Sequence, residues 1–179
     1  DTGLVLFDAD SDGDLDVYAA SGGNFTGPNT PYKQDKLFLN QDGTFQFVPD
    51  ALPQVGRNTA VALPLDYDAD GDLDIFVGSR SLPGNYGTPV ASYIFENDGS
   101  GKFSNPTEKL LPQNGILGMI TDAKWVNILG DEQKELVVVG EWMTPKVLTF
   151  KNGRFELVKT DLDDYAGWWY AAAYSDLDG

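Results

Sequence analysis

Short apolar runs alternate along the chain with segments rich in glycine, proline, asparagine, aspartate and serine. The apolar runs are about four to eight residues long and dense in β-branched and aromatic side chains, which is typical of β-strands. Examples are residues 4–7, 60–65 and 135–140. No apolar run approaches the roughly 18 residues that a membrane-spanning helix needs. The pattern predicts an all-β protein of short strands, with no segment that inserts into a membrane as a helix.

Two acidic segments, residues 8–16 and 66–74, stand between such runs and share the pattern D-x-D-x-D-G-D-L-D. Five carboxylates so close together repel one another unless a cation lies among them. Aspartates at positions 1, 3, 5 and 9, a glycine at 6 and a carbonyl at 7 suit a short loop around Ca²⁺. The predicted calcium residues are Asp8, Asp10, Asp12, Asp14 and Asp16 in the first loop and Asp66, Asp68, Asp70, Asp72 and Asp74 in the second.

These loops are not EF-hands. An EF-hand needs an acidic residue at position 12 and runs into a helix, but position 12 is Ala19 in one loop and Val77 in the other. The residues that follow, 15–19 and 73–77, have strand composition. Each loop is therefore expected to join two antiparallel strands.

The loops belong to a repeat of about sixty residues. Asp8 and Asp66 lie 58 residues apart, and a phenylalanine follows each of them after 37 residues, at Phe45 and Phe103. Each phenylalanine is preceded by a glycine-containing hairpin turn, at residues 40–43 and 97–101. We expect each repeat to contain four strands, which is the composition of a propeller blade. The repeats span about residues 1–50, 57–108, 117–160 and, incompletely, 167–179.

The third and fourth copies differ from the first two. In the third, Glu135 takes loop position 9, Leu129 position 3 and Glu132 the place of the glycine, so we expect this loop to hold no metal. In the fourth, residues 169–174 are predicted to form the first strand. Asp176 and Asp178 then occupy positions 1 and 3 of a further calcium loop, which begins a third site.

The order strand, D-x-D-x-D-G-x-x-D, strand resembles the FG-GAP/VCBS repeat, which builds β-propeller blades in integrin α-subunits and in many secreted or surface proteins of bacteria. Residues 37–45, Leu-Phe-Leu-Asn-Gln-Asp-Gly-Thr-Phe, are similar to a signature of the bacterial members. The resemblance implies about three blades and the start of a fourth, as a fragment of a larger propeller. It also implies a location outside the cell or at the cell surface, such as the bacterial outer membrane, and a role in adhesion or ligand binding.

Composition narrows the classes of function. The 179-residue chain has no cysteine, which excludes disulfides, and no histidine, the commonest general base. Its net charge of −16 argues against nucleic acid and against anionic membrane surfaces. Calcium loops of this kind suit the millimolar Ca²⁺ found outside cells.

Long connections between strands 2 and 3 and between repeats are expected at the end of the blades opposite the calcium loops. They carry four aromatic candidates for contact with a ligand, Phe25, Tyr32, Tyr86 and Trp142. Trp168 and Trp169 are expected to pack in the core, because large aromatic side chains are mostly buried.

Three functions remain open from the sequence. The first is a calcium-stabilised module that presents loops to an extracellular protein or glycan. The second is a polysaccharide-active enzyme, for which the carboxylates on the loop side are candidates, namely Glu108, Glu141, Asp163 and Asp164. The third is a structural or accessory part of a cell-surface uptake assembly.

Overall fold

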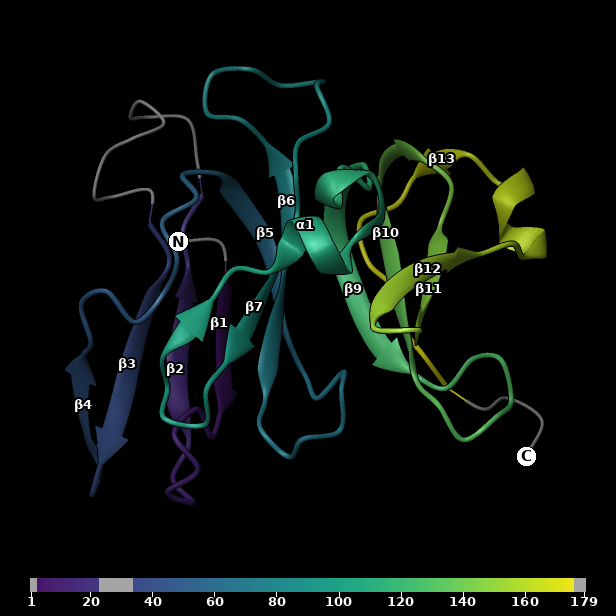
Figure 1. The fold of residues 1–179 in the computed structure, drawn as a ribbon. Helices are drawn as coiled ribbons and strands as arrows, with labels where there is room; N and C mark the ends of the chain where they lie inside the picture. The colour runs from purple at the N-terminus through teal and green to yellow at the C-terminus, as the bar shows by residue number, and fades with distance from the viewer. Residues whose placement is uncertain (1–2, 23–33, 176–179) are drawn as a thin grey trace.

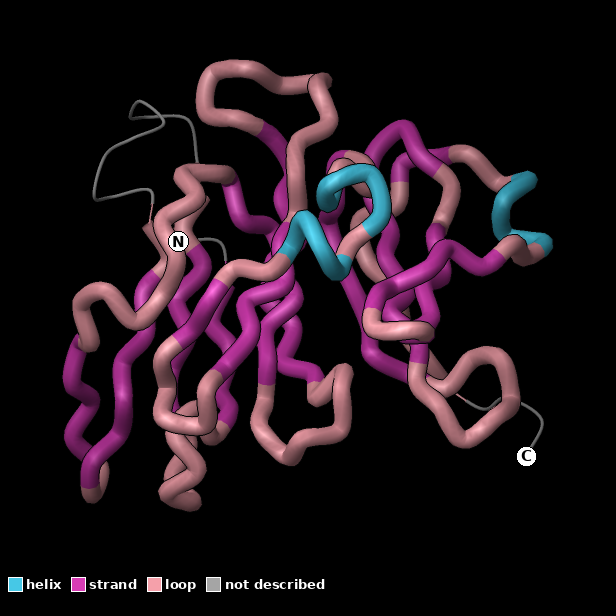
Figure 2. The backbone as a smooth tube through the Cα atoms, in the orientation of Figure 1, coloured by secondary structure: helices cyan, strands magenta, loops and turns pink. Residues whose placement is uncertain are grey.

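The computed structural model describes residues 3–22 and 34–175, which form two four-stranded antiparallel sheets, one five-stranded antiparallel sheet and almost no helix (Figures 1 and 2). The first sheet contains β1 (Gly3–Phe7), β2 (Asp16–Ala20), β3 (Lys36–Gln41) and β4 (Thr44–Phe47). The second contains β5 (Asn58–Leu65), β6 (Asp74–Ser81), β7 (Tyr93–Asn97) and β8 (Phe103–Ser104). The third contains β9 (Met119–Val126), β10 (Glu135–Met143), β11 (Lys146–Lys151) and β12 (Arg154–Val158), and the short β13 (Gly167–Trp168) adds a fifth strand.

Each sheet follows the chain order, so consecutive strands pair with one another. The three sheets stand side by side, and their first strands β1, β5 and β9 contact one another in that order (Figure 1). This is the arrangement of successive propeller blades, and it confirms the prediction of an all-β, propeller-like fragment. The described residues form no closed ring.

Two apolar cores fill the spaces between the sheets. Successive side chains of a strand point to opposite faces of its sheet, so alternate residues pack against the sheet on either side. Thus Ile75 belongs to the core shared with the first sheet, while Phe76 belongs to the core shared with the third. The first core includes Phe7, Tyr18, Leu37, Ile75, Phe95 and Phe103. The second includes Leu65, Phe76, Ile94, Leu136, Leu148 and Phe155.

Two segments differ from the sequence-based expectation. Residues 169–174 are not a strand: only the short β13 (Gly167–Trp168) pairs with β10, and the chain beyond it is held by isolated hydrogen bonds instead of a ladder. One of these runs from the Ala172 N–H to Asp122 Oδ2 at 2.8 Å. The connection from β8 to β9, predicted as a loop, contains the short helix α1 (Thr107–Leu110). Leu110 explains this helix, because it is buried in the second core.

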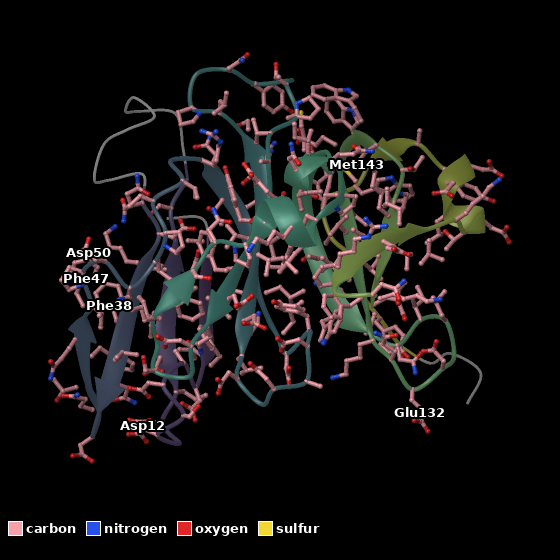
Figure 3. All side chains as sticks on the ribbon, in the orientation of Figure 1. Asp12, Phe38, Phe47, Asp50, Glu132 and Met143 are labelled. Atoms are coloured by element: carbon pink, nitrogen blue, oxygen red, sulfur yellow. The ribbon has the colours of Figure 1, made fainter. Side chains whose placement is uncertain are left out.

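The calcium-type loops and the hairpin turns lie at one end of the sheets, and the connections β6–β7 and β10–β11 lie at the other (Figure 1). Figure 3 places Asp12 and Glu132, from the first and third loops, at the lower end, and Met143 towards the upper end. We call the upper end, which includes residues 82–92, 141–145 and 165–168, the loop face. None of the described helices is long and apolar enough to cross a membrane.

The Asn152–Gly153 turn joins β11 to β12 as a two-residue hairpin turn. Both residues have positive φ, +55° and +76°, as a type I′ hairpin turn requires. Gly153→Ala should lower the free energy of unfolding by about 1–2 kcal/mol, because alanine is strained in the left-handed region. The new Cβ would meet nothing within 4 Å, so the backbone alone would cause the loss.

Urea denaturation followed by circular dichroism measures this effect. Gly3→Ala is the matched control, since Gly3 lies in β1 without a positive φ and also has nothing within 4 Å of an added Cβ. Equal stability of the two variants would contradict the assignment of the turn.

Candidate metal centres and the loop face

The first acidic loop connects β1 to β2 and gathers three of its carboxylates. Ligand oxygens of Asp8, Asp10 and Asp16 all lie within 4.8 Å of one another. The loop turns at Gly13, whose φ of +93° favours glycine. The Gly13 N–H donates to Asp8 Oδ2 at 3.0 Å, and this bond folds the loop back over its first carboxylate. Asp12 is not part of the cluster and instead accepts a hydrogen bond from the Asp14 N–H at 2.9 Å.

The second acidic loop connects β5 to β6 and gathers a slightly different set. Here Asp66, Asp68 and Asp70 bring oxygens within 4.8 Å of one another. The Ala69 N–H donates to Asp66 Oδ1 at 2.7 Å, and the Asp72 N–H donates to Asp70 Oδ1 at 3.0 Å. The two loops share their backbone turn, but their carboxylates converge at different positions.

The ninth residue of each loop ties the loop to its own sheet. Asp16 Oδ2 accepts from the Ala9 N–H at 2.7 Å and Asp16 Oδ1 from the Asn40 N–H at 2.8 Å. In the second sheet, Asp74 Oδ1 accepts from the Asn97 N–H at 2.9 Å. Burial, together with nearby negative charges, raises the pKa of Asp74 to about 7. A positive charge in the loop would favour the ionised form of Asp74 at neutral pH.

Several carboxylate oxygens in the two loops are buried without a hydrogen-bond donor, namely Asp8 Oδ1, Asp10 Oδ1 and Asp74 Oδ2. Burial and the neighbouring carboxylates also raise the pKa of Asp10 and of Asp68. A buried acceptor without a donor is costly. A hard divalent cation that binds oxygen would satisfy these atoms and offset the repulsion, so the residues present fit Ca²⁺.

The third loop, between β9 and β10, is organised by its own hydrogen bonds. Asn127 occupies position 1, and its side-chain amide donates to the carbonyl of Asp131. The N–H groups of Ile128 and Leu129 both donate to Glu135 Oε2, at 3.0 and 3.3 Å. Among the described residues no acidic cluster forms in this loop. Its lack of metal stays a prediction.

Asn97 connects the first two loops. Its side-chain Nδ2 donates to the carbonyl of Ala9, between two of the first loop's aspartates, at 2.8 Å. The same nitrogen donates to the carbonyl of Leu73, next to Asp74, at 3.2 Å. The buried side-chain amide of Asn97 therefore links the two acidic loops, which belong to neighbouring sheets.

The loop face brings two of the aromatic candidates together. The ring centroids of Tyr86 and Trp142 lie 5.5 Å apart, and Trp142 contacts Trp168 at 4.8 Å. Phe25 and Tyr32, the other two candidates, lie outside the described residues, as do Asp176 and Asp178.

The expectation that Trp168 and Trp169 pack in the core is wrong for both residues, and Trp168 is 53% exposed. Trp168 packs edge to face on Trp142 instead of between the sheets. Trp169 is 36% exposed, and its indole N–H donates to the carbonyl of Met143 at 3.2 Å. Both residues thus border the loop face.

An ion pair beneath these rings was not predicted. Glu141 is 1% exposed and accepts from Arg80 at 2.5 Å through Oε1 and from the Tyr86 hydroxyl at 2.5 Å through Oε2. These hydrogen bonds raise the pKa of Arg80 and of Tyr86. In the sequence Glu141 stands out only as a charged residue at the end of an apolar strand. No sequence pattern links it to Arg80, which is 61 residues away.

Residues 8–77 match a family model described as an FG-GAP-like repeat. This segment is an FG-GAP-like repeat. The FG-GAP repeat begins at the first aspartate of the first loop, contains the whole second loop, and ends at Val77 in β6. It thus covers both acidic loops that gather carboxylates in the structure. A search of the curated proteins found no match.

Proposed function

We propose that this chain is part of a calcium-stabilised β-propeller that acts outside the cell or at its surface as a binding module for an extracellular protein or glycan. The observation that carries the proposal is the separation of two ends. One end holds carboxylate clusters with buried oxygens that lack donors. The other end holds exposed aromatic side chains on long connections. A rigid scaffold that carries variable loops is a common basis for binding.

Calcium is the cation that the loops favour. The donors are carboxylates and carbonyls, without any cysteine or histidine in the chain, and hard divalent cations prefer such oxygen ligands. In this proposal Asp8, Asp10 and Asp16 hold one ion, with Asp12 and the Asp14 carbonyl completing the site. The second loop uses Asp66, Asp68, Asp70, Asp74 and the Asp72 carbonyl in the same way.

The proposal includes further blades. The second sheet packs against the first and the third against the second, whereas no sheet among the described residues packs against the corresponding face of the first sheet. Leu6, Val17, Phe38 and Phe47 form one row across this face. Figure 3 shows Phe38 and Phe47 at the outer edge of the molecule. In the second sheet the corresponding row contains Ile75 and Phe95, both fully buried against the first sheet. Leu6 and Phe47, by contrast, are 59% and 52% exposed.

The geometry does not favour the enzyme. Both oxygens of Glu141 are engaged by Arg80 and Tyr86, so Glu141 offers no free carboxylate as an acid or base. Asp163 Oδ2 accepts from the Thr160 N–H at 3.2 Å and caps a turn. These contacts give two of the proposed catalytic carboxylates structural roles.

The calcium part of the proposal predicts loop-specific effects. Asp12→Ala and Asp70→Ala should each remove most of the stabilisation that one bound ion adds, which is about 2.7 kcal/mol at a hundredfold excess over its Kd. Asp131→Ala, at the corresponding position of the third loop, is the matched control and should change the Ca²⁺ response little. Thermal melts in increasing Ca²⁺ measure all three, and an equal loss in all three variants would contradict the assignment.

The binding part is tested by capture of partners from the native cell surface with the intact protein, with and without a Ca²⁺ chelator. A binding module should retain a defined protein or glycan, lose it on chelation, and lose it in Tyr86→Ala with the fold intact. Capture that is indifferent to the loop-face variant and to the chelator would favour the structural role in a surface assembly.

A further inference from the structure

We propose that Tyr86, Trp142 and Trp168 form a stacking platform for the ring of a neutral saccharide, beside which Arg80 supplies hydrogen-bond donors. The inference rests on the proposed binding function and names the ligand class of its loop face. The platform is assembled from three separate segments of the chain: the β6–β7 connection, the end of β10, and β13.

The three rings are packed on one another and still open to solvent. Tyr86, Trp142 and Trp168 are 50%, 53% and 53% exposed. The Trp142 and Trp168 rings meet at 87°, so together they form a corner with two differently oriented faces. Tyr86 extends the corner at an interplanar angle of 57° to Trp142. Contact among the rings limits their rotation, which reduces the ordering cost of binding.

The exposed position of the Trp142 ring depends on a strained backbone conformation. Trp142 has φ of +51°, a left-handed conformation that is a genuine outlier for a bulky residue. It lies in a bulge where the β10–β13 register shifts between Glu141 and Met143. Regular alternation would turn Trp142 away from Trp168, which pairs with Glu141, whereas the bulge brings the two rings together. Strain of this kind clusters at functional sites.

The charges beneath the platform argue against an ionic ligand. Both oxygens of Glu141 are occupied, by Arg80 and by the Tyr86 hydroxyl, so no free carboxylate remains to bind a cation. Arg80 itself lies 5.6 Å from the centroid of the Tyr86 ring, in the place that a cationic ligand would take. Its charge is balanced by Glu141, and the chain carries −16 overall, which disfavours an anionic ligand.

A neutral saccharide fits the aromatic faces and hydrogen-bond donors of the platform without a charge of its own. Its ring presents flat C–H faces to aromatic side chains and hydroxyls to polar groups. Arg80 has five N–H donors and a side chain that is 42% exposed, so donors remain for hydroxyls beside the Tyr86 ring. A protein partner would need roughly 800 Å² on each side, far more than three half-exposed rings provide.

The test uses the intact protein in Ca²⁺ on an array of immobilised oligosaccharides that carries neutral glucose-, galactose- and mannose-terminated chains and sialylated ones. The protein should retain neutral chains. Trp142→Gly and Trp168→Ala should weaken that binding about tenfold or more, as the loss of an aromatic anchor does. Tyr170→Ala is the matched control, an aromatic residue 60% exposed outside the platform, and should change binding less than about twofold.

Trp142→Gly also separates a binding role from a structural one. Glycine accepts a positive φ without strain, so this variant should keep the wild-type melting temperature within a few degrees, or exceed it, while saccharide binding is lost. A large fall of the melting temperature would show that the ring serves the fold, and would overturn the platform.

Other results also overturn the proposal. Saccharide binding that survives Trp142→Gly and Trp168→Ala would place the ligand elsewhere. If the protein retains no saccharide, the saccharide proposal is wrong. Capture of a protein partner that depends on Tyr86 and Ca²⁺ would then still support the proposed binding function. Conversely, saccharide binding at the platform that ignores the chelator would support the platform and contradict the calcium dependence of the proposed function.

Discussion

Asp35→Ala is expected to lower the free energy of unfolding by about 3–5 kcal/mol, the largest effect of any substitution considered for this protein. Asp35 Oδ2 accepts hydrogen bonds from the hydroxyls of Tyr18 and Thr59, at 2.6 and 2.8 Å. Its Oδ1 accepts from the Ser21 N–H at 2.6 Å. Alanine would remove the acceptor from three donors at once.

The position of these donors explains the size of the effect. Tyr18 and Thr59 are 0% and 1% exposed, so water does not easily replace the carboxylate. Tyr18 lies in β2 of the first sheet and Thr59 in β5 of the second. Asp35 therefore joins two blades, and its loss should weaken the contact between them as well as the first sheet.

The pH dependence of this carboxylate has a definite sign. Burial raises the pKa of Asp35 above its ordinary value of 3.8, although its hydrogen bonds act in the opposite direction. A raised pKa means that the folded state holds the proton more tightly than the unfolded state. The stabilisation from Asp35 is therefore complete below about pH 3.8 and is lost as the pH rises through the folded-state pKa.

Asp35→Asn isolates that contribution, because it keeps the shape and removes the charge. The stability of the wild type relative to Asp35→Asn should fall as the pH rises above about 4, as measured by urea denaturation at each pH. Asp164→Ala, which removes an exposed carboxylate, is the control for Asp35→Ala and should stay within about 0.5 kcal/mol of the wild type. A wild type that gains on the asparagine variant with rising pH would show that the hydrogen bonds outweigh burial.

Asn97→Ala is expected to lower the free energy of unfolding by about 2–4 kcal/mol and to weaken both proposed calcium sites together. The side chain is 6% exposed and donates to the carbonyls of Ala9 and Leu73. Ala9 lies between Asp8 and Asp10, and Leu73 precedes Asp74. Removal of the amide would loosen the backbone of one loop and the closing residue of the other.

Asn40→Ala is the matched control, because Asn40 is the equivalent residue of the first sheet. Its Nδ2 donates to the carbonyl of Leu15 at 3.3 Å in an exposed position, and this is its one acceptor among residues 3–22 and 34–175. This variant should cost about 1 kcal/mol or less and leave the second loop unaffected. Calcium titrations of each variant, followed by calorimetry, compare the two sites. Loss of a single site in Asn97→Ala would contradict the coupling.

Much of the fold could be predicted because its signals are local. The carboxylate spacing of the two loops, the hairpin turns at residues 40–43 and 97–101 and the four-strand repeat all depend on residues close together in the chain. Each of them appears in the structure where the sequence indicated. The two short departures depend on tertiary contacts. Leu110 draws a connection into a helix because it enters the second core, and residues 169–174 make isolated hydrogen bonds instead of extending a ladder.

The sequence by itself determined the strands, the turns and the residues of the acidic loops, since backbone preference and ligand spacing act over a few residues. Only the tertiary structure decided which residues of different repeats meet. Asp35 contacts Thr59, Asn97 contacts Ala9 and Trp142 contacts Tyr86 because the sheets stand side by side. Trp142 contacts Trp168 of its own sheet because β10 has a bulge between Glu141 and Met143. Such contacts depend on how whole sheets stack and on one bulge in β10, and no local pattern encodes either.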